Sequence, residues 1–493
     1  MTHPDSAFRL VKGDDLLTRR RLVKFGVMGA ATGALSPGGQ LVGMAQIAKF
    51  SSKRPLESKR QFRSEIVERE IRAVRKRIGD AEMGWLFENC YPNTLDTTVF
   101  PGTVDGKPDT FVVTGDIDAM WLRDSSAQVW HYLGLAKEDV ELRRLIEGVI
   151  RRQVRCLMID PYANAFQRDP TAKAMDWALH DSTTMLPGVA ERKWEIDSVC
   201  YTIRLAHGYW RSTGDKSPFD ESWRAAMHLV VETLQVQQRK QSRGPYHFQR
   251  ASENPTDSLN EGGYGTVARP VGLIHSGFRP SDDACVYPFL IPSNMFAVAM
   301  LRKLEEMARE ILHDQELTLK CRELAAEVEQ ALSLYGRMQH GRNGQIWAYE
   351  VDGFGNALFA DDANLPSLLS LPYLGCAAVE DSDYLRTRVF VLGDDNPYFF
   401  RGKAADGVGG PHIGANQIWP MSIVMRALTS TSPTEIRRCL HWLKTTHAGT
   451  GFMHESFDKD DPAKFTRPWF AWANSLFGEL IMKVSRENPA LLA

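Results

Sequence analysis

Apolar residues recur with a helical period along most of this 493-residue chain. In residues 141–158 they fall three or four positions apart, so that one face of a helix is continuously apolar. Similar patterns predict further helices over residues 57–76, 194–209, 221–238, 293–312, 317–334, 365–374, 384–392, 420–428, 434–446 and 469–485. The chain is therefore expected to pack helix on helix around a common core.

Loops rich in Gly, Pro, Asp and Asn separate these helices, as at residues 254–265, 275–283, 353–364 and 401–414. Strands and helices do not alternate, which argues against a doubly wound sheet. A helical solenoid would show a repeat of fixed length, and none is evident. The pattern favours an all-α fold, a toroid of paired helices known as an α/α barrel, with site-forming loops on one rim.

The first 47 residues differ from the rest of the chain. Residues 18–25 read TRRRLVKF, and a short apolar stretch over 26–35 follows them. This order resembles a twin-arginine export signal, and the stretch is too short to span a membrane. A basic tail before a short buried helix is the alternative. We expect export to the periplasm or the cell exterior, with only transient membrane contact through this signal.

Composition excludes several other classes of protein. The formal net charge is -2, so the chain has no basic field for nucleic acid. The seven cysteines are scattered without a C-x-x-C pair, which argues against a zinc ribbon, a redox motif or a complete disulfide framework. No linker or low-complexity segment divides residues 54–493, which are expected to form a single domain.

Metal and cofactor chemistry also lacks a signal. The sequence contains no phosphate-binding loop, no nucleophile elbow and no H-E-x-x-H. The 13 histidines do not cluster at metal-ligand spacing, so His412 and His454 are expected to form hydrogen bonds instead. No metal and no cofactor is predicted.

Four segments gather charged and aromatic residues next to glycine or proline. The last of them, residues 467–475, reads RPWFAWANS and is expected to start a helix by aromatic packing in the core, with a wall for sugar stacking as the alternative. Residues 115–125 read GDIDAMWLRDS and include Trp121, Arg123 and Asp124. Carboxylates accept hydrogen bonds from sugar hydroxyls, arginine donates to them, and tryptophan stacks on the sugar face. A helix start capped by aspartate, with an internal Arg–Asp pair, explains this string equally well.

Adjacent carboxylates stand out in residues 276–284, which read SGFRPSDDA and include Asp282 and Asp283. Neighbouring side chains rarely aim at one point, so at most one of them is expected to face a scissile bond. Residues 451–457, GFMHESF, place Glu455 between a histidine and a serine that could support a general base. Salt bridges are the alternative interpretation of both segments.

Five strings closely resemble glycoside hydrolase family 125. In chain order they are GDIDAMWLRDSS (115–126), KWEIDS (193–198), SGFRPSDDA (276–284), DDANLP (361–366) and HESF (454–457). The resemblance implies an (α/α)6 barrel, a six-hairpin toroid, over a single catalytic domain of residues 54–493. It also implies an exo-acting α-1,6-mannosidase that removes non-reducing-end mannose from glycans, without metal and with inversion at the anomeric carbon.

The resemblance implies that Asp282 is the general acid, with Asp283 as the alternative, and that Glu455 is the general base. An inverting pair stands roughly 6.5–9.5 Å apart, with a protonated acid and an ionised base. Arg279 would oppose protonation of Asp282 by pairing with it, so we expect Arg279 to face substrate or another carboxylate. His454 or Ser456 could support the base. Expected substrate contacts are Trp121, Arg123, Asp124, Arg279, Asp362, Asn364, His412 and His454.

Other functions on a helical barrel stay open at this point. The chain could be a glycosidase of different specificity, such as an α-1,2-mannosidase or an α-glucosidase, or a related phosphorylase. It could also be a carbohydrate-binding protein with inactive catalytic groups. The presence of both Asp282 and Glu455 argues against the last alternative.

Overall fold

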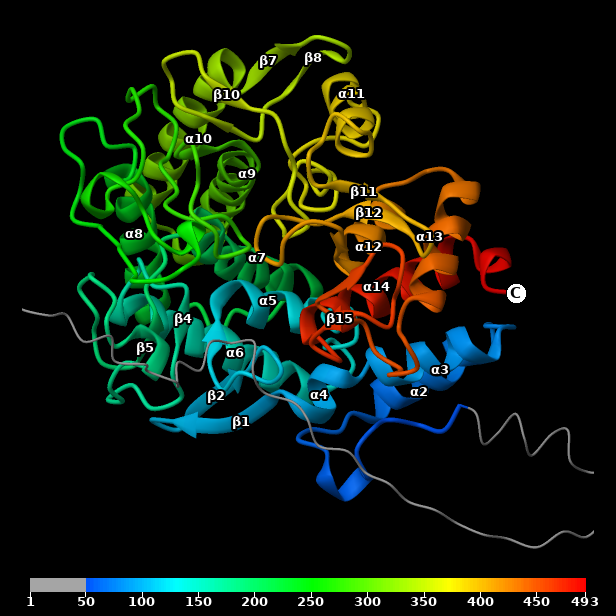
Figure 1. Ribbon diagram of the computed structural model, residues 1–493. Helices are drawn as coiled ribbons and strands as arrows, with labels where there is room; N and C mark the ends of the chain where they lie inside the picture. Colours follow the sequence, from blue (N-terminus) through cyan, green and yellow to red (C-terminus); the bar gives the residue numbers. More distant parts are fainter. Residues whose placement is uncertain (1–49) are drawn as a thin grey trace, which may run out of the picture. The chain divides into compact units, whose positions relative to one another are not determined.

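The computed structural model describes residues 50–493, which form one compact and mostly helical unit (Figure 1). The export signal predicted for residues 1–47 lies outside the described residues. Within residues 50–493, no helix has the length and apolar character that crossing a membrane requires.

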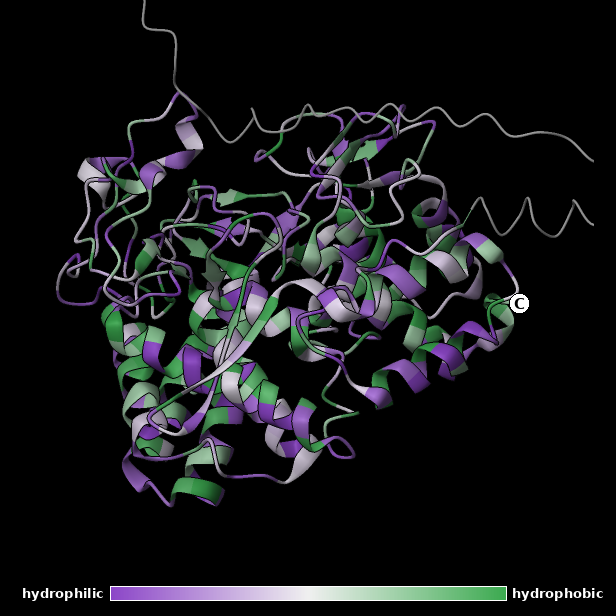
Figure 2. Cartoon of the chain, turned by 90° about the horizontal axis from the view of Figure 1, so that it is seen from below, coloured by the Kyte–Doolittle hydropathy of each residue, from purple (hydrophilic) through white to green (hydrophobic). Residues whose placement is uncertain are grey.

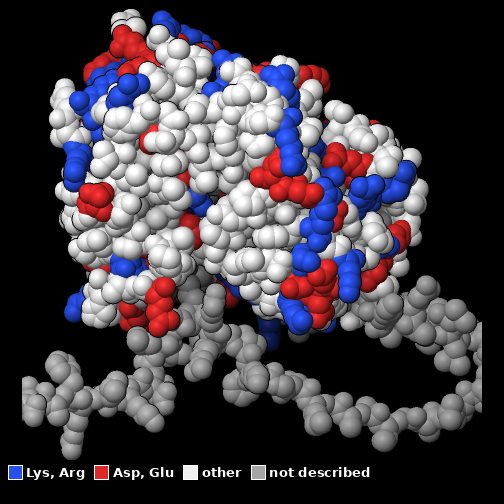
Figure 3. All heavy atoms as spheres, turned by 45° about the horizontal axis from the view of Figure 1, so that its top comes forward, with Lys and Arg blue, Asp and Glu red and all other residues white. Residues whose placement is uncertain are grey.

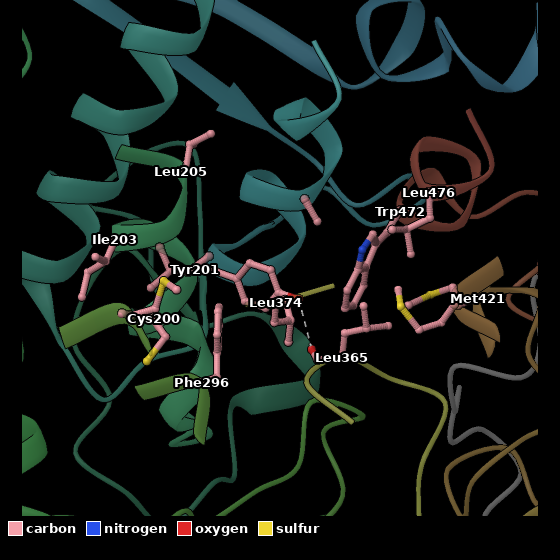
Figure 4. Close-up of a cluster of buried hydrophobic side chains, with 14 of the residues drawn as sticks. Cys200, Tyr201, Ile203, Leu205, Phe296, Leu365, Leu374, Met421, Trp472 and Leu476 are labelled. Carbon is pink, nitrogen blue, oxygen red and sulfur yellow. Dashed lines mark hydrogen bonds between the residues drawn. The ribbon is translucent and has the colours of Figure 1, made fainter. Parts of the chain in front are cut away.

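Five helices form an inner ring. They are α5 (Leu122–Trp130), α7 (Ile196–Thr213), α9 (Ile291–Met307), α12 (Pro420–Leu428) and α14 (Ala471–Glu487). Helix α5 packs against α7 and α14, α7 packs against α9, and α12 packs against α14. Their apolar faces meet in the core of Figure 4, where Tyr201 packs edge-on against Phe296 and Trp472.

Residues 365–375 lie between α9 and α12 in the chain and contribute to the same core. They form a series of turns, so the helix predicted for 365–374 is wrong. Pro366 and Pro372 explain the difference, because each lacks the N–H that a regular helix needs. Leu365 and Leu374 still point into the core (Figure 4), and the Tyr201 hydroxyl donates to the Leu365 carbonyl at 3.4 Å.

Outer helices pair with the inner ring. They are α2 (Glu65–Arg75), α3 (Ala81–Cys90), α6 (Val140–Ile159), α8 (Glu221–Val236), α10 (Gln315–Tyr335), α11 (Ser382–Val391) and α13 (Pro433–Thr445). Helix α6 packs on α7, α10 on α9, α13 on α12, and α3 on α14. Hydrophilic and hydrophobic residues alternate around the helices in Figure 2, as the sequence pattern predicted for helices with one buried face.

Inner and outer helices differ at their first turns. Each of these outer helices has an N-cap whose side chain accepts a backbone N–H: Ser64, Asp80, Asp139, Asp220, Asp314, Asp381 and Ser432. The N-caps of the five inner helices make no such bond, and they are Trp121, Glu195, Leu290, Trp419 and Phe470. The first-turn N–H groups and positive dipole ends of the inner helices are therefore available to other groups.

Short antiparallel strands lead into three of the inner helices. One sheet joins β3 (Met120–Trp121), β4 (Ala165–Phe166) and β5 (Val189–Glu191), a second joins β6 (Phe289–Leu290), β9 (Glu350–Val351) and β10 (Ala357–Leu358), and a third joins β13 (Gln417–Ile418), β14 (Ser456–Asp458) and β15 (Phe465–Thr466). Strands β3, β6 and β13 end just before α5, α9 and α12. They therefore fix where the first turns of these helices lie.

The remaining strands form three hairpins. They are β1 (Val99–Val104) with β2 (Lys107–Val112), β7 (Arg337–His340) with β8 (Gly344–Trp347), and β11 (Phe399–Arg401) with β12 (Asp406–Val408); the short helix α4 (Asn93–Thr97) precedes the first of them. Strand β2 lies against α6 at Gly148. A Cβ atom at Gly148 would stand 2.4 Å from the Thr110 hydroxyl and 2.9 Å from the backbone of Asp109 and Thr110.

Replacing Gly148 by Ala tests this close approach. The added methyl would push β2 away from α6, and we expect the free energy of unfolding to fall by about 1–3 kcal/mol, measured by urea denaturation. Without the clash, alanine in a helix interior would stabilise the protein. Gly134→Ala is the matched control, because no atom lies within 4 Å of its Cβ position. Unchanged or increased stability of Gly148→Ala would contradict the packing described.

Candidate active site

Charged residues are interspersed on the surface, whereas several others are gathered in the interior. In Figure 3, acidic and basic residues are interspersed, and no continuous basic surface is visible on this face of the described residues. Several charged residues are instead buried, with exposed fractions of 3% for Arg123, 2% for Arg279 and 0% for Glu195 and Asp197. Buried charges are costly unless they are paired or used, so this cluster marks the place to look for chemistry.

Contacts between first turns bring the starts of the inner helices together. Arg123, in the first turn of α5, reaches Glu195 just before α7 and lies 5.7 Å from the Trp472 ring in α14. Trp419, just before α12, packs edge-on against Phe470, just before α14. These helices therefore direct their N-terminal ends toward one region.

Arg123 gathers four carboxylates around one guanidinium. Its Nη1 donates to Glu195 Oε2 at 2.6 Å and to Asp197 Oδ2 at 3.0 Å. Its Nη2 lies 3.7 Å from Asp282 Oδ1, and its Nε lies 3.7 Å from Asp124 Oδ2. The side chain that the sequence predicted as a sugar contact thus faces protein carboxylates, and its hydrogen bonds to them come from Nη1 alone.

These carboxylates do not titrate like exposed ones. Burial raises the pKa of Asp124 to about 6 and that of Asp197 to about 6, although Arg123 opposes the shift in both. Burial also raises the pKa of Glu195 well above its ordinary value, and the negative charges of Asp197 and Asp282 add to the effect. Glu195 therefore favours its protonated form, whereas Asp124 and Asp197 lose their protons at a higher pH than exposed aspartates do.

Asp282 sits at the tip of a tight turn. Its backbone has φ of +69°, a left-handed conformation that is uncommon outside glycine. The Arg279 N–H donates to the Asp283 carbonyl at 2.8 Å, and the Asp282 N–H donates to the Arg279 carbonyl at 2.9 Å. Lys193 Nζ donates to the Asp282 carbonyl at 2.7 Å. The turn is thus held from both sides, with the Asp282 side chain 14% exposed.

The adjacent Asp283 has the opposite surroundings. It is fully buried and accepts hydrogen bonds from the Thr256 hydroxyl at 2.6 Å and the Ser281 hydroxyl at 3.1 Å. Burial alone would raise the pKa of Asp283, but His412 and Thr256 hold it below its ordinary value. Asp283 is therefore an ionised, fully bonded carboxylate, and only Asp282 of the pair is open to a ligand.

His412 connects this turn to Glu455. Its Nδ1 lies 3.6 Å from Asp283 Oδ1. Burial would lower the pKa of His412, yet Asp283 and the charges of Glu455 and Asp282 raise it to about 9. The His412 side chain is therefore a charged imidazolium at neutral pH. It lies near Asp282, Asp283 and Glu455, so the segments 276–284 and 451–457 meet at one site.

Glu455 pairs with an arginine that the sequence interpretation had not assigned. Arg467 Nη1 donates to Glu455 Oε1 at 3.3 Å, and Nη2 contacts Asp116 across the rim. The expected support from His454 or Ser456 is wrong. His454 stacks on Phe465 and lies 3.2 Å from the Arg467 carbonyl, because the three-stranded sheet holds it there. The Ser456 hydroxyl bonds to that of Thr466 at 2.8 Å.

Other predicted contacts occupy supporting positions. Arg279 Nε donates to Glu350 Oε1 at 2.6 Å, so it meets another carboxylate instead of Asp282. Asn364 Nδ2 donates to Asp362 Oδ1 at 3.1 Å. Trp121 lies in a small apolar cluster with three buried alanines, and its ring is 4% exposed.

Polar atoms without partners concentrate in this region. Among the described residues, buried atoms that have no hydrogen-bond partner include Trp121 Nε1, Glu195 Oε1, Asp197 Oδ1, Arg279 Nη2, Asp362 Oδ2, His454 Nε2 and Arg467 Nε. Buried polar groups are normally satisfied, and a ligand with many hydroxyls can both donate and accept. The arrangement therefore fits a sugar better than an apolar ligand.

Several residues of the site escaped the sequence analysis. Glu195 and Asp197 belong to the KWEIDS string, yet no role was assigned to them. The sequence feature that could have revealed them is a pair of acidic residues at the start of an apolar helix. Arg467 was interpreted as part of an aromatic packing segment. Asn164, which donates to Asp282 Oδ1 at 3.3 Å, has no sequence signal at all.

The fold and the site together define a glycoside hydrolase on a helical toroid. Within residues 50–493, no group of three His, Cys, Asp or Glu side chains is placed to hold a metal ion. Residues 80–482 match a family model described as "Metal-independent alpha-mannosidase (GH125)". The chain therefore belongs to glycoside hydrolase family 125, a family of metal-independent α-mannosidases, as the five strings indicated.

Two relatives cover most of the chain. The chain is 41% identical over 456 residues to the Schizosaccharomyces pombe (strain 972) protein called "Meiotically up-regulated gene 157 protein", covering 89% of each. A solved structure from Streptococcus pneumoniae, described as a metal-independent α-mannosidase in a non-productive complex with α-1,6-mannobiose, is 40% identical with a TM-score of 0.82. That match covers 86% of this chain and 99% of the other, which confirms the six-hairpin fold.

Arg467→Gln tests whether the hydrogen bond between Arg467 and Glu455 matters for activity. We expect kcat for an α-mannoside to fall about 10- to 100-fold, since a charged hydrogen bond contributes about 1.5–3 kcal/mol. The KM and the unfolding midpoint should change much less. Arg342→Gln is the control, because the Arg342 side chain is 82% exposed and, within residues 50–493, forms an ion pair with Asp395 alone. An unchanged kcat in Arg467→Gln would remove this arginine from the reaction.

Proposed function

We propose that this α-mannosidase removes single α-1,6-linked mannose residues from the non-reducing end of glycans and inverts the anomeric carbon. The proposal assigns Asp282 as the general acid and Glu455 as the general base. The observation that carries it is the contrast between the two adjacent aspartates. Asp283 is buried and fully bonded, whereas Asp282 is open and stands near Glu195, a carboxyl group whose pKa burial raises well above its ordinary value.

A general acid must be protonated when the substrate arrives. Asp282 lies at the edge of a group in which burial and like charges raise the pKa of Asp124, Asp197 and Glu195. The turn that carries Asp282 is rigidly held by Lys193 and by the anchored Asp283. Its carboxyl group is therefore suited to give a proton to the glycosidic oxygen.

A general base must be ionised and must face water on the opposite side of the sugar. Arg467 lies beside Glu455, and the charge of His412 is nearby, so the ionised carboxylate is stabilised. The base and the acid come from different parts of the chain, residues 454–457 and 276–284. An inverting enzyme requires the two carboxyl groups to stand about 6.5–9.5 Å apart, with water between the base and the sugar.

An exo-acting enzyme needs a pocket that is closed beyond the terminal sugar. The contact between Arg467 and Asp116 joins two distant segments at the rim. Asp362 and Asn364 line the same region from another loop, since the charges of Asp283 and Arg279 act on Asp362. The α-1,6 preference is supported by the disaccharide in the relative from Streptococcus pneumoniae.

Two variants separate the acid from the base. With α-1,6-mannobiose, both Asp282→Asn and Glu455→Gln should lose about 10²- to 10⁴-fold in kcat. With 2,4-dinitrophenyl α-mannoside, whose leaving group needs no proton, Asp282→Asn should retain most of its activity and Glu455→Gln should not.

Asp118→Asn is the matched control, because the Asp118 side chain is 75% exposed. It should behave like the unmodified protein with both substrates. Equal losses of Asp282→Asn on both substrates would mean that Asp282 is not the acid. Activity on α-1,2- or α-1,3-mannobiose in place of the α-1,6 isomer would overturn the linkage proposed.

A further inference from the structure

The group around Arg123 carries more negative charge than positive. One guanidinium faces the carboxylates of Glu195, Asp197, Asp282 and Asp124, at 2.6, 3.0, 3.7 and 3.7 Å. Burying several ionised carboxylates against a single cation is unfavourable, and the usual outcome is that some of them keep a proton. At least one of these four carboxyl groups is therefore expected to keep a proton.

Glu195 has one oxygen with partners and one without. Its Oε2 accepts from Arg123 Nη1 at 2.6 Å and from the Ser198 hydroxyl at 2.8 Å. Its Oε1 is buried and has no donor among the described residues. The neighbouring carboxyl group is that of Asp282, whose Oδ1 lies 3.7 Å from Nη2 of the same guanidinium. After the larger effect of burial, the charge of Asp282 and a hydrogen bond to it raise the pKa of Glu195. Two carboxyl groups can form such a bond only if one of them carries a proton.

We propose that Glu195 and Asp282 share one proton, so that Glu195 is a positioning residue that keeps the donor carboxyl of Asp282 loaded. This inference rests on the proposed role of Asp282 as the general acid. A carboxyl pair that holds one proton over a wide pH range titrates as a unit, because the second ionisation would create two adjacent buried anions.

The proton balance of one turnover follows from this pair. Asp282 gives the shared proton to the glycosidic oxygen as the bond to the anomeric carbon breaks. The attacking water gives its proton to Glu455. The pair is then fully ionised, and it takes up a proton from solvent while Glu455 releases one. No oxidant, reductant or further reactant is required.

Few other groups around the pair can compete for the proton. The titratable and charged groups that face it are Arg123, Asp124, Asp197, Lys193, Tyr246, Cys285 and His412. Burial raises the pKa of both Tyr246 and Cys285, so both stay neutral. Asp197 bonds to Arg123 Nη1, the same nitrogen as Glu195, and acts on the pair through its charge.

Glu195→Gln tests the sharing through the pH dependence of kcat/KM for α-1,6-mannobiose. The basic limb of this profile reports loss of the donor proton from the free enzyme. An amide at position 195 cannot share a proton, and it can donate to ionised Asp282. The basic limb should therefore move to lower pH by about one unit or more. Glu306→Gln, the same change near the end of α9, should leave it in place.

Ser198→Ala provides a second test that acts in the opposite direction. Removing the Ser198 hydroxyl takes a donor from ionised Glu195, so the pair should hold its proton more tightly. The basic limb should then move to higher pH, by less than it moves down in Glu195→Gln. This variant changes one small side chain and also serves if Glu195→Gln fails to fold.

The outcomes separate this inference from the proposed function. A limb that moves down in Glu195→Gln and up in Ser198→Ala supports the shared proton. A limb that stays in place in both variants, or moves down in Ser198→Ala, overturns it. If Asp282→Asn behaves as an acid variant while these limbs stay fixed, the sharing alone fails. If Asp282→Asn does not behave so, the proposed function fails.

Discussion

The first turns of the inner helices carry no side-chain caps of their own, and the rest of the site depends on this. Outer helices satisfy their first turns with Ser or Asp, whereas the inner ones begin after Trp, Glu, Leu or Phe. Positive dipole ends that meet in one region favour negative groups there. Asp124 and Asp197 occupy these first turns, and Arg123 holds them with Glu195. A concentration of buried carboxylates is therefore built into the toroid.

Two carboxylates that face different partners can then perform different tasks. Asp282 stands near Glu195, whose pKa burial raises well above its ordinary value, and Glu455 stands beside Arg467 and the charged His412. Around both carboxyl groups, burial strengthens each interaction between charges relative to the same interaction in water. The enzyme needs no metal ion to create them, which agrees with the metal-independent family to which the chain belongs.

Local patterns in the sequence predicted the helices well, because each buries one periodic face. They failed at residues 365–375, where two prolines replace a helix by turns that still supply core leucines. The motif strings supplied residues that the structure brings together, yet they left Asp282 and Asp283 undecided as the acid. The left-handed backbone of Asp282 separates the two side chains, and sequence spacing does not reveal it. Likewise, the pairing of Arg467 with Asp116 joins residues 351 positions apart.

The stereochemistry of the released sugar tests the account most directly. Hydrolysis of α-1,6-mannobiose by the purified protein can be followed by proton NMR before the anomers of mannose equilibrate. We predict β-mannose as the first product, because in the proposed mechanism Glu455 directs water to the face opposite the leaving group that Asp282 protonates. Early α-mannose would show retention. One of the carboxylates would then act as a nucleophile, and the assignment of acid and base would be wrong.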